Sequence, residues 1–172
     1  MAQDVASGGL VVGVDGSAAA LAALRWSAAK ARLLHTHVLA VHAWLPSGYL
    51  RAPYARVLER PTPDQDRARA AATLEENVAQ LLRTHPDADV VSLLREGPAA
   101  AVLLRHAQDA LFLALGRKPR TDVTQPALGP VARACVRLAA CPVVTVPEPP
   151  PGAEESGLPW LRDDWAGSLE RA

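Results

Sequence analysis

The chain has 172 residues, with 18 acidic and 18 basic side chains, and 49% of its residues are apolar. This is the length of one domain with a sizeable core, and the even charge balance argues against a polyanion-binding, collagen-like or acidic disordered protein. No apolar run approaches the length of a membrane span, and the first residues lack signal-peptide features, so we expect a cytoplasmic protein. The two cysteines, Cys135 and Cys141, lack metal-ligand spacing and are expected to be small buried side chains.

Apolar runs of strand length alternate along the chain with segments of helical period. Several runs are apolar at consecutive positions, which means that both faces of their sheet must be covered. This pattern predicts an α/β fold with a parallel sheet. The predicted strands are Leu10–Val14, Val38–Trp44, Asp89–Leu94, Ala110–Leu115 and Val143–Val146.

Four helices are predicted between these strands, because apolar residues recur there on one helical face. Ser17 is placed to cap the first helix, His85-Pro86 to end the second, and Pro98 and Pro130 to begin the third and the fourth. The apolar faces consist of Leu21, Leu24, Ala28 and Ala31; Leu74, Val78, Leu81 and Leu82; Ala100, Leu103, Leu104 and Ala107; and Val131, Ala134, Cys135 and Leu138.

Helices on both faces require the chain to reverse its direction across the sheet at least once. Periodicity alone leaves the strand order open, but a doubly wound order of 3-2-1-4-5 would place the reversal between the first and fourth strands. Ligands of such sheets bind beyond the carboxyl ends of the strands at the reversal. The segments to inspect are therefore 15–17 and 116–129.

The compact pattern stops near Val146, which predicts a domain over residues 1–147 and a Pro-rich linker with an acidic, Trp-containing tail over residues 148–172. Residues 147–172 carry six acids and two arginines, a net charge of −4, so that the rest of the chain carries +4. Leu161, Trp165 and Leu169 follow at i, i+4 and i+8. Because exposed aromatic area is costly, we expect the segment 160–169 to dock on its own domain or on a partner protein.

The sequence offers no set of residues for catalysis. Strict phosphate-binding, nucleophile-elbow and zinc-protease motifs are absent, and no nucleophile, base and orienting group can be grouped. His35 and His37 form the only close histidine pair, and without a third ligand an exposed turn is favoured over a metal site. We therefore expect no catalytic residue, no metal, no enzyme activity, and neither nucleic acid nor a membrane as partner.

Three residues at the predicted reversal could meet a ligand. Asp15 ends the first strand, where it would either support the following helix electrostatically or accept hydrogen bonds from a ribose or base. Gly116 follows a predicted strand and Gly129 precedes a helix. At such places the backbone can approach a phosphate and donate free N–H groups to it.

With these residues in place, the chain resembles the universal stress proteins over residues 9–147. The resemblance implies the 3-2-1-4-5 sheet, a cytoplasmic stress or dormancy role without catalysis, and a homodimer formed through the last strand, Val143, Val144, Thr145 and Val146. The matching segments are Val11-Val12-Gly13-Val14-Asp15-Gly16-Ser17, Val41-His42-Ala43, Glu96-Gly97-Pro98-Ala99, Asp109-Ala110 and Cys141-Pro142-Val143-Val144.

One subgroup of the family binds ATP through the pattern G-x2-G-x9-G-[S/T]. Gly116 and Gly129 match its first and third glycines, whereas the second glycine falls on Pro119 and the hydroxyl residue on Pro130. Proline removes an N–H at each place, and the hydroxyl that would contact phosphate is missing. The resemblance therefore implies that the binding of ATP or another adenine nucleotide is weak or lost.

Other residues could compensate in part. By the same resemblance, Asp15 matches the acidic residue turned toward the nucleoside and Ala43 matches a backbone position that contacts adenine. Arg117, Lys118 and Arg120 could hold phosphates as charged donors, which would make the protein a true ATP or AMP sensor. A solvated basic loop is the favoured interpretation of these three residues.

Overall fold

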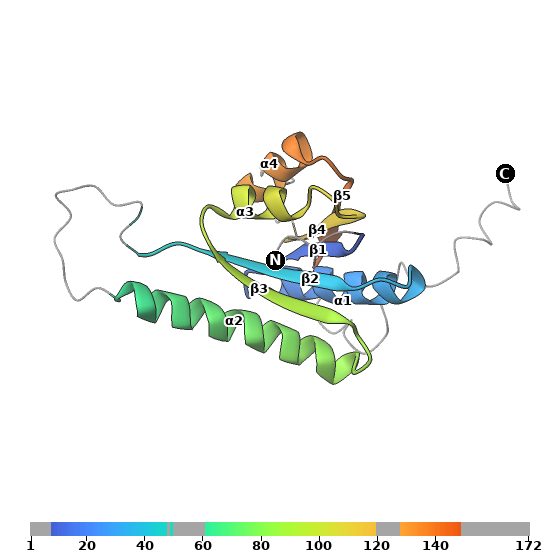
Figure 1. Ribbon diagram of the computed structural model, residues 1–172, viewed down its shortest axis with the longest axis horizontal. Coiled ribbons are helices and arrows are strands. Elements are labelled where there is room, and N and C mark those ends of the chain that lie inside the picture. Colours follow the sequence, from blue (N-terminus) through green and yellow to red (C-terminus); the bar gives the residue numbers. More distant parts are fainter. Residues whose placement is uncertain (1–7, 48, 50–60, 120–127, 149–172) are drawn as a thin grey trace, which may run out of the picture.

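The computed structural model describes residues 8–47, 49, 61–119 and 128–148, in which strands and helices alternate as the sequence pattern predicts (Figure 1). The elements are β1 (Leu10–Gly13), α1 (Ala18–Leu33), β2 (Val38–Trp44), α2 (Pro63–Thr84), β3 (Val90–Glu96), α3 (Ala99–His106), β4 (Phe112–Arg117), α4 (Pro130–Leu138) and β5 (Val143–Pro147). Arg120 and the predicted docking segment 160–169 lie outside the described residues.

The strands form one parallel sheet in the order β3-β2-β1-β4-β5. This confirms the predicted fold class and places the reversal between β1 and β4, where Leu10 pairs with Val38 on one side and with Phe112 on the other. In the described part of the chain no helix is long and apolar enough to cross a membrane.

Alternating residues of the strands point to two separate cores. One core packs Leu10, Val12 and Val38 against α1 and α2, whose Leu24 and Leu81 are fully buried. The other core packs strand residues of the opposite face against α3 and α4; it includes Val11, Leu39, Val41, Leu113, Leu103 and Cys135. Figure 1 shows α3 and α4 together on one side of the sheet. Both faces are therefore covered, as the consecutive apolar residues require.

The helix boundaries follow from local chemistry. The Ser17 hydroxyl accepts a hydrogen bond of 3.1 Å from the N–H of Ala20 and so caps α1, as predicted. At the start of α2 the Thr62 and Gln65 side chains form a reciprocal capping box. Gly129 precedes α4, and Pro130 occupies its first turn, where a missing N–H costs no helical hydrogen bond.

β4 begins and ends two residues later than its predicted bounds of 110–115. Gly116 and Arg117 pair with Val146 and Pro147 of β5, and the N–H of Glu148 donates to the carbonyl of Arg117 over 2.9 Å. The prediction that Gly116 follows the strand was therefore wrong, because the neighbouring strand β5 extends the pairing beyond the apolar run. Gly116 lies within β4.

Candidate functional site

A cavity of about 470 Å³ opens at the carboxyl ends of β1 and β4, at the reversal of the sheet. Its walls come from the ends of β1, β2 and β4, the first turns of α1 and α3, and the start of α4. The six candidate residues that the structure describes all line it: Asp15, Ala43, Gly116, Arg117, Lys118 and Gly129. Residues separated by more than a hundred positions in the sequence thus share one hollow.

Asp15 is tied to the start of α1. Its Oδ1 atom accepts hydrogen bonds from the backbone N–H of Ser17 at 3.0 Å and from the Ser17 hydroxyl at 2.6 Å. Gly16 between them has a φ of 83°, and a Cβ atom there would lie 2.9 Å from the methyl group of Thr73 on α2. The supporting role of Asp15 at this helix is thus present in the structure, and Asp15 is also one of the residues that line the cavity.

The two matched glycines stand in different surroundings. A Cβ atom on Gly116 would lie 2.3 Å from the carbonyl carbon of Ala19, so the close approach of α1 to β4 requires a glycine there. A Cβ atom on Gly129 would have no heavy atom within 4 Å. Packing within the described residues therefore explains Gly116 but leaves Gly129 unexplained.

The cavity is lined both by charged side chains and by prolines, which lack a backbone N–H donor. Arg117 is half-buried, whereas Lys118 is exposed, and Pro119 and Pro130 both line the wall. The first backbone hydrogen bond of α4 runs from the N–H of Arg133 to the carbonyl of Gly129. The backbone N–H groups that precede Arg133 therefore donate no hydrogen bond within α4, and Pro130 has no N–H at all. This mouth is suited to an anion but has lost donors that a glycine and a serine would provide.

β2 contributes Ala43 and a satisfied histidine. Ala43 is half-buried and packs against the core beneath α3 and α4. His42 contacts the carbonyl of Val14 through its Nδ1 atom over 2.5 Å, so one nitrogen of its ring has a partner in the fold. The N–H of Val14 in turn donates to the carbonyl of Val41. These contacts hold the ends of β1 and β2 together at the cavity.

Apolar residues of the wall were not among the predicted site residues. Ala20, Leu103, Leu115 and Val131 line the cavity and also belong to buried layers of the fold. Their sequence signal is the same as that of any core residue. Only the strand order shows that their ends face a hollow.

The cysteines lie away from this cavity. Cys135 is fully buried in α4, and Cys141 is half-buried and packs against the same core. Burial raises the pKa of both thiols above their ordinary value of 9.0. Burial therefore favours the protonated thiol over the nucleophilic thiolate in both side chains.

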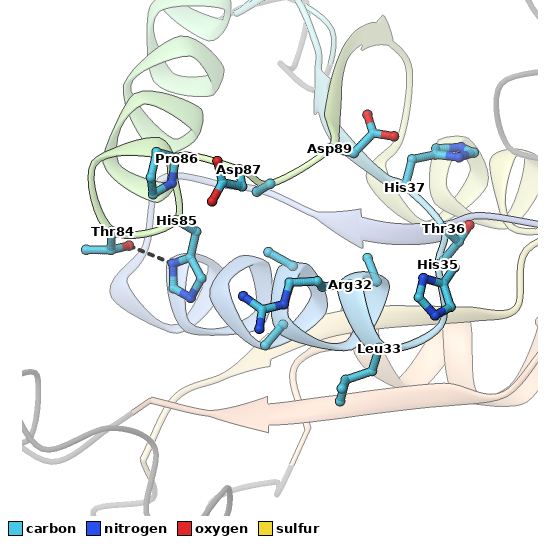
Figure 2. A pocket seen from close by; sticks show the side chains of 14 residues that line it. Arg32, Leu33, His35, Thr36, His37, Thr84, His85, Pro86, Asp87 and Asp89 are labelled. Carbon is cyan, nitrogen blue, oxygen red and sulfur yellow. Dashed lines mark hydrogen bonds between the residues drawn. The ribbon is translucent and has the colours of Figure 1, made fainter.

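A second cavity, of about 790 Å³, lies at the end of the sheet where the strands begin, between the last residues of α1 and of α2 (Figure 2). Arg32, His35, Asp87 and Asp89 line it and are exposed to solvent. In Figure 2 the side chain of His85 lies at this cavity; its Nδ1 atom is 2.8 Å from the Thr84 hydroxyl. Although it is the larger hollow, it lies where the strands begin, away from the reversal.

Neither cavity has the geometry of a metal centre. Among residues 8–47, 49, 61–119 and 128–148, no group of three or more His, Cys, Asp and Glu side chains could hold a metal ion. His35 stands in a turn with a φ of 52°, and it is exposed.

Comparison with known proteins agrees with this architecture. A model described as the universal stress protein family matches residues 9–147. The chain belongs to this family. The match covers all five strands and four helices that the structure describes, and it includes every residue of the cavity between β1 and β4.

Relatives within the universal stress protein family are distant. A universal stress protein from Mycolicibacterium smegmatis is 28% identical over 164 residues, which cover 94% of this chain and 55% of the relative. The chain thus spans about half the length of that curated relative.

Two solved structures from Archaeoglobus fulgidus share the fold. A universal stress protein is 25% identical with a TM-score of 0.61, and covers 81% of this chain and 98% of its own. The other, a universal stress protein in complex with dAMP, is 24% identical with a TM-score of 0.60, and covers 82% of this chain and 98% of its own.

Proposed function

We propose that this chain is a non-catalytic stress-response protein of the cytoplasm that acts as a homodimer and binds adenine nucleotides weakly. The observation that carries the proposal is the cavity between β1 and β4, where all six candidate residues meet at the reversal of the sheet. Such a position is where open α/β sheets bind their ligands. A related structure of the same fold holds dAMP. Asp15 and Ala43 would face the nucleoside, and Arg117 and Lys118 would face phosphate.

The weakness of binding follows from the two prolines in the cavity wall. Pro119 and Pro130 remove two N–H donors and a hydroxyl from the positions that hold phosphate in the ATP-binding subgroup. Contacts of this kind contribute about 1.5–3 kcal/mol each when well aligned. The loss of two such contacts lowers affinity roughly a hundredfold or more, at 1.4 kcal/mol per tenfold change.

A second candidate function is a true ATP or AMP sensor. The observation that favours it is the position of Arg117 and Lys118 on the cavity wall, where they could replace the lost backbone donors. The two functions predict different affinities of the chain for adenine nucleotides. Submicromolar binding that depends on these two side chains belongs to the sensor, and weaker binding belongs to the first proposal.

Titration calorimetry with AMP and with ATP tests both functions on the full chain. We expect dissociation constants above about 1 µM for the unmodified protein. The double change Pro119→Gly/Pro130→Ser should strengthen binding about tenfold or more, because it restores two N–H donors and adds a hydroxyl. The matched control is Arg67→Ala/Arg83→Ala on α2, which removes two exposed cations that do not line the cavity and should leave the heat of binding unchanged.

Two results would decide against weak binding. Submicromolar affinity that disappears in Arg117→Ala/Lys118→Ala would establish the sensor. Absence of any heat from the unmodified and the restored variants alike would show that the cavity takes no adenine nucleotide.

A further inference from the structure

One helix of the fold leaves an apolar strip uncovered by any described residue. Val136 and Leu138 at the end of α4 are 51% and 68% exposed. A shallow hollow of about 400 Å³ runs along the same helix, and its lining consists of Leu128, Pro130, Arg133, Ala134, Val136 and Arg137. We call these residues together with Leu138 the α4 strip. Pro130, Ala134 and Leu138 follow one another at a spacing of four residues, so they lie on one side of α4 and form an apolar line there.

The charge around the α4 strip has one sign. Arg133 and Arg137 flank its apolar residues, and neither α4 nor the adjacent α3 contains an acidic residue. On the opposite side of the sheet, by contrast, α2 carries charges of both signs, four acids and three arginines. An occupant of the α4 strip must therefore be apolar along one side and acidic beside it.

We propose that the α4 strip is the docking site for residues 159–169 of the same chain. This segment supplies the required chemistry: Leu161, Trp165 and Leu169 recur at i, i+4 and i+8, and Asp163 and Asp164 lie between them. Pro130, Ala134 and Leu138 recur on α4 with the same spacing. Residues 147–172 carry a net charge of −4, and the rest of the chain carries +4. An amphipathic segment laid on an apolar helical strip is a common mode of peptide recognition.

The chain is long enough to make this contact. The N–H of Glu148 donates to the carbonyl of Arg117 at the end of β4. The chain therefore leaves the sheet at the carboxyl ends of the strands, where α4 also begins. Trp160 lies twelve positions after Glu148, and a Pro-rich chain extends about 3.1 Å per position, or roughly 37 Å in all. A helix of nine residues is only about 14 Å long. Every part of the α4 strip is within this reach.

A second copy of the chain fits the strip less well. Self-contact of two α4 strips across a two-fold axis would bring together two surfaces whose charged residues, Arg133 and Arg137, are all basic. Such a contact adds no acidic group and places like charges together. The proposal does not rest on nucleotide binding, although Leu128 and Pro130 line both the α4 strip and the cavity between β1 and β4.

Hydrogen exchange read by mass spectrometry on the full chain tests the proposal. We expect amides within residues 159–169 to exchange about tenfold or more slowly than an unprotected peptide, because docking orders them. Arg133→Glu/Arg137→Glu should abolish this protection. Arg67→Glu/Arg83→Glu makes the same charge change on exposed residues of α2 and should retain it. Circular dichroism verifies that both variants keep their helices.

Three results would overturn the proposal. Full exchange of residues 159–169 in the unmodified chain would show that they do not dock on it. Protection that survives Arg133→Glu/Arg137→Glu would place the segment elsewhere. Protection that falls on dilution would assign the α4 strip to the tail of a second copy.

Discussion

At the scale of single residues, the structure separates glycines that packing requires from a glycine that it does not. Gly116 has the backbone of Ala19 where its side chain would be, whereas the space around Gly129 is empty. The sequence pattern treats both alike, because each matches a glycine of the same motif. Packing therefore accounts for the glycine at position 116, whereas the glycine at position 129 is free to serve a ligand.

Equal substitutions at these two glycines should have unequal effects. Gly116→Ser should lower the free energy of unfolding by about 1–3 kcal/mol, because the new Cβ overlaps backbone that cannot move freely. Gly129→Ser should change it by no more than about 0.5 kcal/mol, since the site is open and serine is favoured before a helix. Urea unfolding measures both values. Equal losses would show that the close approach of α1 to β4 is not rigid.

Two histidines should make stability depend on pH. Burial, followed by the charges of Arg25 and Arg32, holds the pKa of His85 below its ordinary value of 6.5. Burial, with Arg95 and Arg105, does the same to the pKa of His106. The unfolded chain therefore takes up protons first, and the folded state loses stability as the pH falls from about 6.5 toward the lowered pKa values.

The measurement is the free energy of unfolding between about pH 7.5 and pH 5.5. The double variant His85→Gln/His106→Gln should show a smaller loss over this interval than the unmodified chain. The same pH dependence in both proteins would mean that other groups cause it.

At the scale of elements, local signals placed the helices well and the strand ends less well. Ser17, Pro98 and Pro130 stand at helix starts as predicted, because caps and prolines act within one turn. The end of β4 depends on its pairing with β5, which lies some thirty residues further along the chain. Nothing in the sequence near Gly116 indicates that pairing.

The same substitution, serine to alanine, should change the free energy of unfolding in opposite directions at two positions of α1 and its cap. Ser17→Ala removes the cap and should lower the free energy of unfolding by about 1 kcal/mol. Ser27→Ala should raise it by about 1 kcal/mol, because the buried Ser27 hydroxyl has no hydrogen-bond partner among the described residues. Thermal or urea unfolding reads both. Destabilisation by Ser27→Ala would reveal a partner for that hydroxyl.

At the scale of the whole molecule, the parallel sheet has two open edges, β3 and β5. In β5 the carbonyl of Pro142 and the N–H of Glu148 point toward β4, so by alternation the backbone groups of Val143 and Thr145 point outward. The side chain of Val146 is buried within the chain. A dimer through Val143–Val146 would therefore rest on the outward backbone groups and on the half-exposed side chains.

The proposed dimer can be tested by a proline at each edge. Thr145→Pro removes an outward N–H of β5 and should yield a monomer in sedimentation at about 30 µM. In β3 the carbonyl of Asp89 accepts a hydrogen bond from Val38 of β2, so by alternation the N–H of Ser92 points away from the sheet. Ser92→Pro removes this outward N–H at the other edge and should leave the dimer intact. A monomeric unmodified chain, or dissociation by Ser92→Pro instead, would contradict pairing through β5.

The sequence by itself determined the alternation of strands and helices, the cover on both faces and the starts of three of the four helices. These depend on periodicity, capping and proline, which act over a few residues. Through a family resemblance it also indicated the residues around Asp15 and Gly116 that meet at the reversal. Only the tertiary structure decided that they share one cavity, that Gly116 serves helix packing, and that α4 leaves Leu138 uncovered. Each of those facts depends on which segments distant in the chain become neighbours, and no local pattern encodes such neighbours.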